Sequence, residues 1–382
     1  MNKTYIAMND KNMTRRDFLA KSGMLAGAAA VLPGTTLMGK GKTEPAEKAT
    51  GLPGVYGPKL KFRPDGTFKI VQFTDTHYII GHRGCPRMLK LLPMVLEKEK
   101  PDLVVYTGDM VFDAPAVPAL KEVLHLTADK GIPFAYVFGN HDAEYDEKQP
   151  ALYEAALSVK GNVMPPFGGD GKMDYAVTIH DHEGKEPAAL LYCLHYYGGN
   201  PFDRPMRDQF EGMPRRRVKG YAWITKDQVE WYSKTSEGVK EALGRRIPAL
   251  AFFHVPLLEY RYAIQDPDTT FIGVRREGIG CPELNSGLFT AMREHEDVMA
   301  TFAGHDHDND YAVLYHDILL AYGRMSGSDT VYNHLPIGAR VIRLKEGKRE
   351  FDSWADLHDG TVTDTWTYPT SFVDGPGNPD WK

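Results

Sequence analysis

The chain has few cysteines, no excess of positive charge and no long apolar run. Its 382 residues include only three cysteines, Cys85, Cys193 and Cys281, which are too few and too scattered for a disulfide framework or a cysteine-ligated metal site. Lysine and arginine number 45 against 51 aspartates and glutamates, giving a formal charge of −6, so a nucleic-acid polymer is not an expected partner. Any bound metal must therefore be held by His, Asp, Glu or Asn side chains.

The N-terminal segment has the pattern of an export signal. Arg15 and Arg16 precede a weakly apolar, Ala/Gly-rich stretch over residues 23–32, which resembles a twin-arginine signal peptide. No run reaches the roughly 20 apolar residues of a membrane-spanning helix. We expect a signal over residues 1–40, transport by the twin-arginine translocase, and a periplasmic or extracellular mature protein without a transmembrane segment. An ordinary amphipathic first helix that happens to contain Arg-Arg is the alternative.

One catalytic domain follows the signal. Residues 41–58 are rich in Lys, Pro, Gly and Glu and are interpreted as a linker. From 59 to 382 there is no second low-complexity break and no internal repeat. The length of this domain favours a core built on two sheets over a single small one.

Short apolar strands end abruptly in residues that can bind metal. Strands are predicted over 70–73, 103–106, 134–138, 250–253 and 298–303, and later over 312–314, 318–322 and 339–344. The first five are followed by Asp75-Thr76-His77, Gly108-Asp109, Gly139-Asn140-His141-Asp142, His254 and Gly304-His305-Asp306-His307. Predicted helices over 88–99 and 117–129 make the first third a series of β-α-β units. Because parallel strands bring their carboxyl ends to one edge, the five clusters can converge.

These clusters supply a mixed set of nitrogen and oxygen ligands. They contain two carboxylates, one amide and four imidazoles, from Asp75, His77, Asp109, Asn140, His254, His305 and His307. Such a set suits Fe, Mn or Zn. Seven ligands exceed one tetrahedral site but suffice for two ions if one carboxylate bridges them. A dinuclear centre of this kind favours an anionic substrate such as a small phosphate ester.

The order of the motifs resembles that of the calcineurin-like metallophosphoesterases: D-x-H, G-D, G-N-H-D, a lone His after a strand, and G-H-x-H. Segments 221–224, 253–256, 284–289 and 304–311 are similar to the branch related to purple acid phosphatases. The resemblance implies an α/β fold of four layers, with two mixed sheets packed face to face and helices on both outer sides. Phe112 stands where the purple enzymes have a tyrosinate ligand, so we expect His77 to take its place and no charge-transfer colour.

The resemblance also implies roles for individual residues. One metal ion would be held by Asp75, His77 and His307, the other by Asn140, His254 and His305, with Asp109 bridging. His141 would contact the phosphoryl group or protonate the leaving oxygen, its ring oriented by Asp142 or Asp75. The implied reaction is hydrolysis of phosphate mono- or diesters by in-line attack of a metal-bound hydroxide. A metal-binding but catalytically weak exported binding protein is the alternative function.

Each motif taken alone also has a structural explanation. A lone Asp75 or Asp109 after a strand can cap a helix, and an isolated His254 is typical of a core histidine. The alternating aspartates of the last motif, Asp306, Asp308 and Asp310, more simply indicate a polar turn whose side chains bond to backbone groups. They are therefore not counted as metal ligands.

Two further features have open interpretations. His195 ends the apolar run 189–194 and is expected to be a partly buried ordinary histidine, with entry into the pocket as the alternative. The segment 196–220 contains Asn200, Arg204, Arg207, Arg215, Arg216 and Arg217. These arginines could clamp a second phosphate or a carboxylate, but a solvated basic loop is favoured. Nucleotides, cyclic phosphodiesters and phospholipid headgroups all fit the predicted reaction.

Overall fold

Two β-sheets form the centre of the fold. The structure is a computed structural model that describes residues 51–167, 172–199 and 220–373, all within one compact unit, Pro45–Lys382. The larger sheet has the order β1-β5-β6-β7-β9-β11-β10-β8 and the smaller one the order β14-β13-β12-β2-β3-β4. The strands are β1 Val55–Lys61, β2 Thr67–Phe73, β3 Leu103–Thr107, β4 Phe134–Val137, β5 Tyr175–His180, β6 Pro187–Cys193, β7 Ala249–Phe252, β8 Phe271–Arg275, β9 Val298–Ala303, β10 Asn309–Tyr315, β11 Ile318–Tyr322, β12 Gly338–Lys345, β13 Phe351–Leu357 and β14 Val362–Tyr368.

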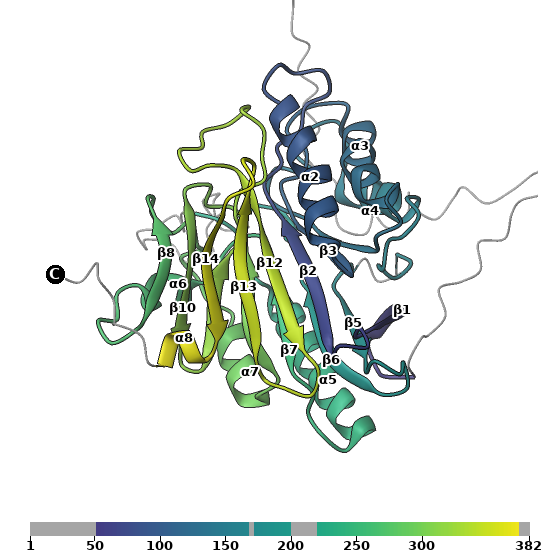
Figure 1. The fold of residues 1–382 in the computed structure, drawn as a ribbon, viewed down its shortest axis with the longest axis vertical. Coiled ribbons are helices and arrows are strands. Elements are labelled where there is room, and N and C mark those ends of the chain that lie inside the picture. The colour runs from purple at the N-terminus through teal and green to yellow at the C-terminus, as the bar shows by residue number, and fades with distance from the viewer. Residues whose placement is uncertain (1–50, 168–171, 200–219, 374–382) are drawn as a thin grey trace, which may run out of the picture. The chain divides into compact units, whose positions relative to one another are not determined.

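Both sheets are mixed. In the smaller sheet β2, β3 and β4 run parallel, while β12, β13 and β14 add antiparallel neighbours beside β2 (Figure 1). In the larger sheet β6, β7, β9 and β11 run parallel, and β10 and β8 follow antiparallel. Each sheet therefore has a parallel region whose strands deliver their carboxyl ends to the same side.

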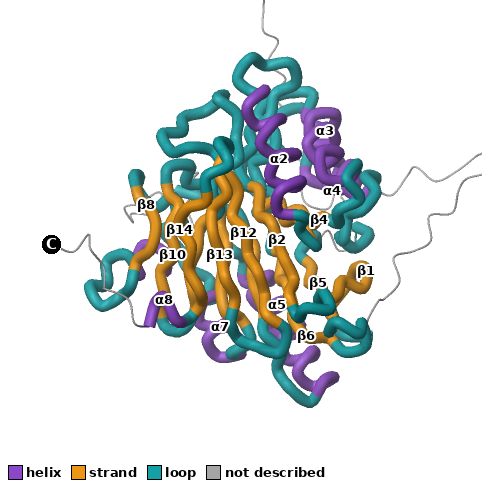
Figure 2. Tube along the Cα trace, viewed as in Figure 1, coloured by secondary structure: helices purple, strands orange, loops and turns teal. Residues whose placement is uncertain are grey.

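Helices lie outside the two sheets (Figure 2). The helices are α2 Pro86–Glu99, α3 Ala116–Ala128, α4 Gln149–Leu157, α5 Lys226–Leu243, α6 Leu258–Ala263, α7 Leu288–His295 and α8 Thr370–Val373. α2 packs against β2, and α3 packs between α2 and α4. α5 has a capping box, in which the Thr225 hydroxyl accepts from the Gln228 amide and the Gln228 side chain accepts from the Thr225 amide.

Alternation along the strands divides the core into two clusters. On β7, Leu250 and Phe252 pack into the cluster between the sheets, which continues to α2 and α3. Ala249 and Ala251 face the second cluster, which lies under α5, α6 and α7. Successive strand residues point to opposite faces, so β7 is covered by the other sheet on one face and by helices on the other. The four-layer α/β fold predicted from the sequence is confirmed.

The predicted strands occur in the structure, with one difference in arrangement. β9 and β11 have the predicted bounds, 298–303 and 318–322. The five strands that lead into the polar clusters do not share one sheet, however, because β2, β3 and β4 belong to the smaller sheet and β7 and β9 to the larger. β1 starts at Val55 and so includes the last residues of the segment interpreted as a linker.

No described helix is both long and apolar enough to span a lipid bilayer. The predicted signal over residues 1–40, and the arginines of the insert at positions 204–217, lie outside the described residues.

Candidate metal centre

Backbone hydrogen bonds join the turns that follow neighbouring strands within each sheet. The Asp75 and His77 amides donate to the Gly108 and Asp109 carbonyls, both at 3.0 Å. The Gly304 amide donates to the His254 carbonyl at 3.0 Å, which joins the turns after β9 and β7. Side-chain bonds connect the sheets, because the His305 amide donates to both Asp75 oxygens at 3.1 and 3.0 Å. Five segments far apart in sequence thus form one polar site.

Two groups of possible metal ligands lie in this site. Asp75, His77 and His307 form one group, and Asp109, His254 and His305 form the other. Within each group, one ligand atom from every residue lies within 4.8 Å of the others, and all six residues are buried. Asn140, the remaining predicted ligand, follows β4, and its Oδ1 is buried without a hydrogen-bond partner.

Short distances separate nitrogen and oxygen atoms of the site that can act as metal ligands. His77 Nε2 lies 3.0 Å from His307 Nε2, and His254 Nε2 lies 3.0 Å from Asp109 Oδ2. Asp109 Oδ2 also lies 3.9 Å from His77 Nε2, so this oxygen is close to a ligand of each group. Ligands about 2.1 Å from one ion are about 3 Å apart when they are adjacent. The donor atoms therefore fit metal ions of the kind that bind both imidazole and carboxylate.

Two imidazoles are fixed in the orientation that metal binding needs. His254 Nδ1 donates to the Thr107 carbonyl at 2.7 Å, and His307 Nδ1 donates to the Tyr332 carbonyl at 3.0 Å. A carbonyl can only accept, so the proton of each neutral ring is on Nδ1. The Nε2 lone pair of each ring then points into the site.

The protein alone leaves the two carboxylates with negative charge to be compensated. Burial by itself would raise the pKa of Asp75, but the facing His254 and His307 rings and a hydrogen bond from His77 lower it to about 2. Burial opposes protonation of His254, yet the carboxylates of Asp109 and Asp75 raise the pKa of His254 to about 10. Buried anions that attract a proton this strongly also attract cations.

Backbone conformation at the site is strained. Four of the predicted ligands, Asp75, His77, Asp109 and His305, have positive φ angles of 53°, 45°, 52° and 77°. Residues other than glycine rarely adopt this region, and such strain persists where the surrounding contacts impose it. At this site the strained residues lie in the turns that aim the ligands.

Glycines allow the turns to approach the ligands closely. A Cβ atom at Gly139 would lie 2.1 Å from Asp109 Oδ1, and one at Gly304 would lie 2.0 Å from Thr74 Oγ1 and 2.7 Å from Asp75 Oδ2. Any side chain at either position would displace a predicted ligand. This explains the glycines of the G-N-H-D and G-H-x-H motifs.

The partner of His141 differs from the sequence-based prediction. His141 Nδ1 lies 2.6 Å from Glu144 Oε2, so Glu144 orients the ring instead of Asp142 or Asp75. Asp142 is fully buried and accepts hydrogen bonds from the Asp109, Met110 and Gly139 amides at 2.9, 2.7 and 2.7 Å. Its carboxylate uses these hydrogen bonds to hold the turns together and therefore does not orient His141.

Phe112 and His195 fill structural positions. The Phe112 ring packs edge-on against His77 and His141, with ring centroids 4.8 and 5.0 Å apart. His195 is buried, accepts a hydrogen bond from the Phe138 amide at 3.0 Å, and has its pKa lowered by burial to about 3. It is thus a neutral histidine of the core, more completely buried than the partly buried one favoured from the sequence, and it also lines the pocket that contains His254.

The three aspartates of the last motif have separate partners. Asp306 accepts from the Gly280 amide and the Tyr322 hydroxyl, and Asp308 accepts from the His334 amide at 2.6 Å. Asp310 differs from the predicted backbone bonding, because it is ion-paired with Arg324 and Arg340.

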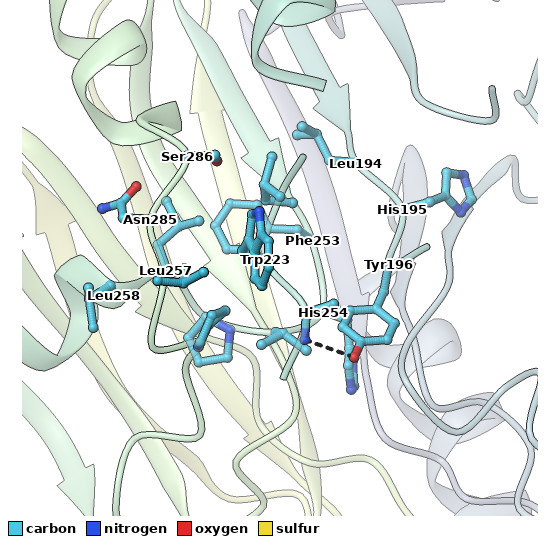
Figure 3. Close-up of a pocket in the computed structure, with 16 residues that line it drawn as sticks. Leu194, His195, Tyr196, Trp223, Phe253, His254, Leu257, Leu258, Asn285 and Ser286 are labelled. Atoms are coloured by element: carbon cyan, nitrogen blue, oxygen red, sulfur yellow. Dashed lines mark hydrogen bonds between the residues drawn. The ribbon is translucent and has the colours of Figure 1, made fainter. Parts of the chain in front are cut away.

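An apolar pocket lies beside His254. Trp223, Phe253 and Leu257 are among the residues that line it (Figure 3). At its edge the Ala222 amide donates to the Tyr196 hydroxyl at 3.2 Å.

The open side of the site has residues that the motifs did not reveal. A cleft of about 360 Å³ is lined by Asp109, His141, His305 and His307, together with Tyr221, Glu277 and Tyr332. Glu277 and Tyr332 follow no strand predicted from the sequence and belong to no motif. Only the folded chain brings them to the ligands.

Comparison with known proteins identifies the family. Residues 68–309 match the calcineurin-like phosphoesterase family. An Arabidopsis thaliana protein named "Probable inactive purple acid phosphatase 28" is 31% identical over 78% of this chain and 80% of its own length. The Saccharomyces cerevisiae "Phosphatase DCR2" is 30% identical over 67% of this chain and 46% of its own length. The chain therefore belongs to the calcineurin-like phosphoesterase family and has relatives among the purple acid phosphatases.

A solved structure supports the fold. A dimetal phosphatase from Danio rerio superposes with a TM-score of 0.53 at 15% identity, covering 78% of this chain and 98% of that protein. At this identity the likeness concerns the arrangement of sheets and helices.

Proposed function

We propose that this calcineurin-like phosphoesterase is a dinuclear-metal hydrolase of small phosphate mono- or diesters. The observation that carries the proposal is the pair of adjacent buried ligand groups, with Asp109 Oδ2 close to imidazoles of both. An accessible cleft reaches the same residues. A purely structural ion would not need an open approach from solvent.

The family pattern and the geometry support the same division of ligands. Asp75, His77 and His307 would hold one ion, Asn140, His254 and His305 the other, and Asp109 would bridge them. Two ions of Fe, Mn or Zn would supply Lewis-acid stabilisation of phosphoryl charge and would lower the pKa of a water molecule to about 7.

The chain's own residues orient the reaction. His141 lines the cleft and is held at Nδ1 by Glu144, so its Nε2 is available to contact a phosphoryl oxygen or to give a proton to the leaving oxygen. The His141 amide donates to Asp109 Oδ1 at 2.8 Å, which holds the His141 backbone beside the proposed bridging carboxylate. Asp142 stabilises the backbone on which both residues stand.

A specific observation favours a second candidate function. The Arabidopsis relative is named as probably inactive, so an exported protein that binds metal and turns over phosphate esters poorly is the alternative. The two candidates share the metal centre and differ only in turnover.

Metal analysis combined with a substrate panel separates these candidates. We expect about two metal equivalents per chain, hydrolysis of p-nitrophenyl phosphate or bis-p-nitrophenyl phosphate, and loss of hydrolysis after chelation. His141→Ala should lower kcat about 10²- to 10⁴-fold with metal content retained. Bound metal without turnover of any ester would favour the alternative, and absence of metal binding would contradict both.

We also propose export through the twin-arginine route, which is supported by the Arg15-Arg16 pattern and the apolar stretch after it. The double variant Arg15→Lys and Arg16→Lys should retain the protein in the cytoplasm, as measured by cell fractionation. Unchanged export of this variant would contradict the proposal.

A further inference from the structure

The cleft over the metal centre has an unusual charge for a phosphate site. Its described lining residues include the carboxylates Asp109, Glu277 and Asp306 but no lysine or arginine. The substrate phosphate would be met by the proposed metal ions, and among the described lining residues no cationic side chain is available to a second anionic group on the substrate. The rim of the cleft is suited to something other than a polyphosphate.

Glu277 brings negative charge to this rim. The segment that carries it follows β8, and the side chain is partly buried. Glu277 Oε1 accepts from the Asp308 amide at 2.6 Å, and Oε2 accepts from the Tyr332 hydroxyl at 2.8 Å. Both donors are neutral, so they orient the carboxylate without cancelling its charge.

Two tyrosine rings stand at the same cleft. The Tyr221 ring lies 4.2 Å from the His305 ring, and the Tyr332 ring lies 4.6 Å from the His307 ring, measured between centroids. They remain 37% and 52% exposed. Each proposed metal ion thus has an exposed aromatic ring next to one of its histidine ligands. Of the two tyrosines, Tyr332 is the one hydrogen-bonded to Glu277.

We propose that the cleft selects phosphate esters that carry an ammonium group, with Tyr221, Tyr332 and Glu277 receiving the cation. Aromatic faces attract alkylammonium ions, and the Glu277 carboxylate adds direct Coulomb attraction. This inference rests on the proposed hydrolase function. Water adds to phosphorus and gives up a proton, and the bond from phosphorus to the leaving oxygen breaks. The leaving oxygen takes up a proton and departs as the alcohol or phenol, or it departs as its anion and the proton passes to solvent.

A matched pair of substrates tests the selection. p-Nitrophenyl phosphorylcholine and p-nitrophenyl 3,3-dimethylbutyl phosphate have the same leaving group, the same charge at phosphorus and nearly the same shape, but only the first carries a quaternary ammonium group. We expect kcat/KM to be about tenfold higher for the choline ester, which corresponds to about 1.4 kcal/mol. Phosphorylcholine should also bind the metal-loaded protein more tightly than 3,3-dimethylbutyl phosphate in a calorimetric titration.

Variants locate the selectivity. Glu277→Gln and Tyr221→Leu should each reduce the preference at least threefold, while Tyr332→Phe, which keeps the ring, should reduce it less than Tyr332→Leu. Glu241→Gln removes an exposed carboxylate on α5 and should leave the preference unchanged. Metal content is measured for every variant, because Glu277 accepts a hydrogen bond from the amide of Asp308, the residue that follows His307.

The outcomes distinguish this inference from the function beneath it. Hydrolysis of both diesters at equal kcat/KM would overturn the preference for cations and leave the hydrolase intact. A higher kcat/KM for the p-nitrophenyl ester of thymidine 5′-monophosphate than for the choline ester would assign the rings to base stacking and would also overturn the inference. If the protein hydrolysed none of these esters and did not hydrolyse p-nitrophenyl phosphate, the proposed function itself would be overturned.

Discussion

The metal centre and a second buried charged cluster differ in how the negative charge of their buried carboxylates is compensated. The second, here named the arginine cluster, consists of Asp310, Arg324, Arg340 and Asp364. Asp310 on β10 is fully buried and pairs with Arg340 on β12, so this cluster also connects the two sheets. Arg324 Nε lies 2.6 Å from the other Asp310 oxygen.

The difference between the two clusters lies in where the compensating charge comes from. In the arginine cluster two guanidinium groups balance two carboxylates within the chain. In the metal centre the ion-pair partners of Asp75 and Asp109 are imidazoles instead. Buried polar atoms without a hydrogen-bond partner occur in both clusters, among them Asn140 Oδ1 in the metal centre and Arg340 Nε in the arginine cluster. Buried charge must be paired, so the charge of the first cluster is balanced within the chain, whereas the proposed metal ions would balance the charge of the second.

The sharpest way to break this comparison is to remove the proposed bridging carboxylate. Asp109→Asn should lower phosphate-ester hydrolysis by about three orders of magnitude or more, because the site loses charge between the two ligand groups. kcat/KM for p-nitrophenyl phosphate and metal content measure the effect, with circular dichroism as a control for folding. Near-normal turnover would contradict a role for Asp109 in the metal centre.

The equivalent change in the arginine cluster should affect stability instead. Asp310→Asn leaves two buried guanidinium groups without their shared partner, which should lower the free energy of unfolding by about 3–5 kcal/mol. Urea unfolding measures this loss, and folded protein should keep its metal. Asp329→Asn removes one partner of the exposed Arg87–Asp329 pair and should cost less than about 1 kcal/mol. If Asp310→Asn lost its metal but not its stability, the two clusters would act as one functional unit, which would contradict the comparison.

A third buried carboxylate extends the comparison to the pH dependence of stability. Asp174 accepts from the His195 amide at 2.7 Å and from Gln228 Nε2 and the Tyr197 hydroxyl at 3.0 Å. Burial raises the pKa of Asp174 to about 7. A carboxyl whose folded pKa exceeds its unfolded value near 4 stabilises the protein below pH 4, and this contribution is lost as the pH rises to about 7.

Comparison with Asp174→Asn isolates this effect. Because asparagine cannot titrate, the difference in unfolding free energy between wild type and variant should shift against the wild type between pH 4 and 7. Urea unfolding at saturating metal across this range measures the difference, since metal binding then affects both proteins alike. A constant difference would show that Asp174 stays ionised in the folded protein.

Local sequence features predicted the strands and most of the candidate site. β9 and β11 could be bounded to the residue because uninterrupted apolar runs end at polar turns. The predicted ligands His254 and His305 directly follow such runs. Glu144 was not predicted to orient His141, since three residues of separation in a turn do not specify which carboxylate reaches the ring.

By itself the sequence determined which atoms are available: carboxylate, amide and imidazole ligands at the ends of strands, with glycines where the turns need them. Only the tertiary structure decided that these ligands come from two packed sheets, that Thr107 and Tyr332 carbonyls fix the protons of His254 and His307, and that Asp310 meets Arg340. The physical reason is that strand formation and side-chain chemistry depend on neighbouring residues, whereas charge compensation depends on distances across the fold that only packing sets.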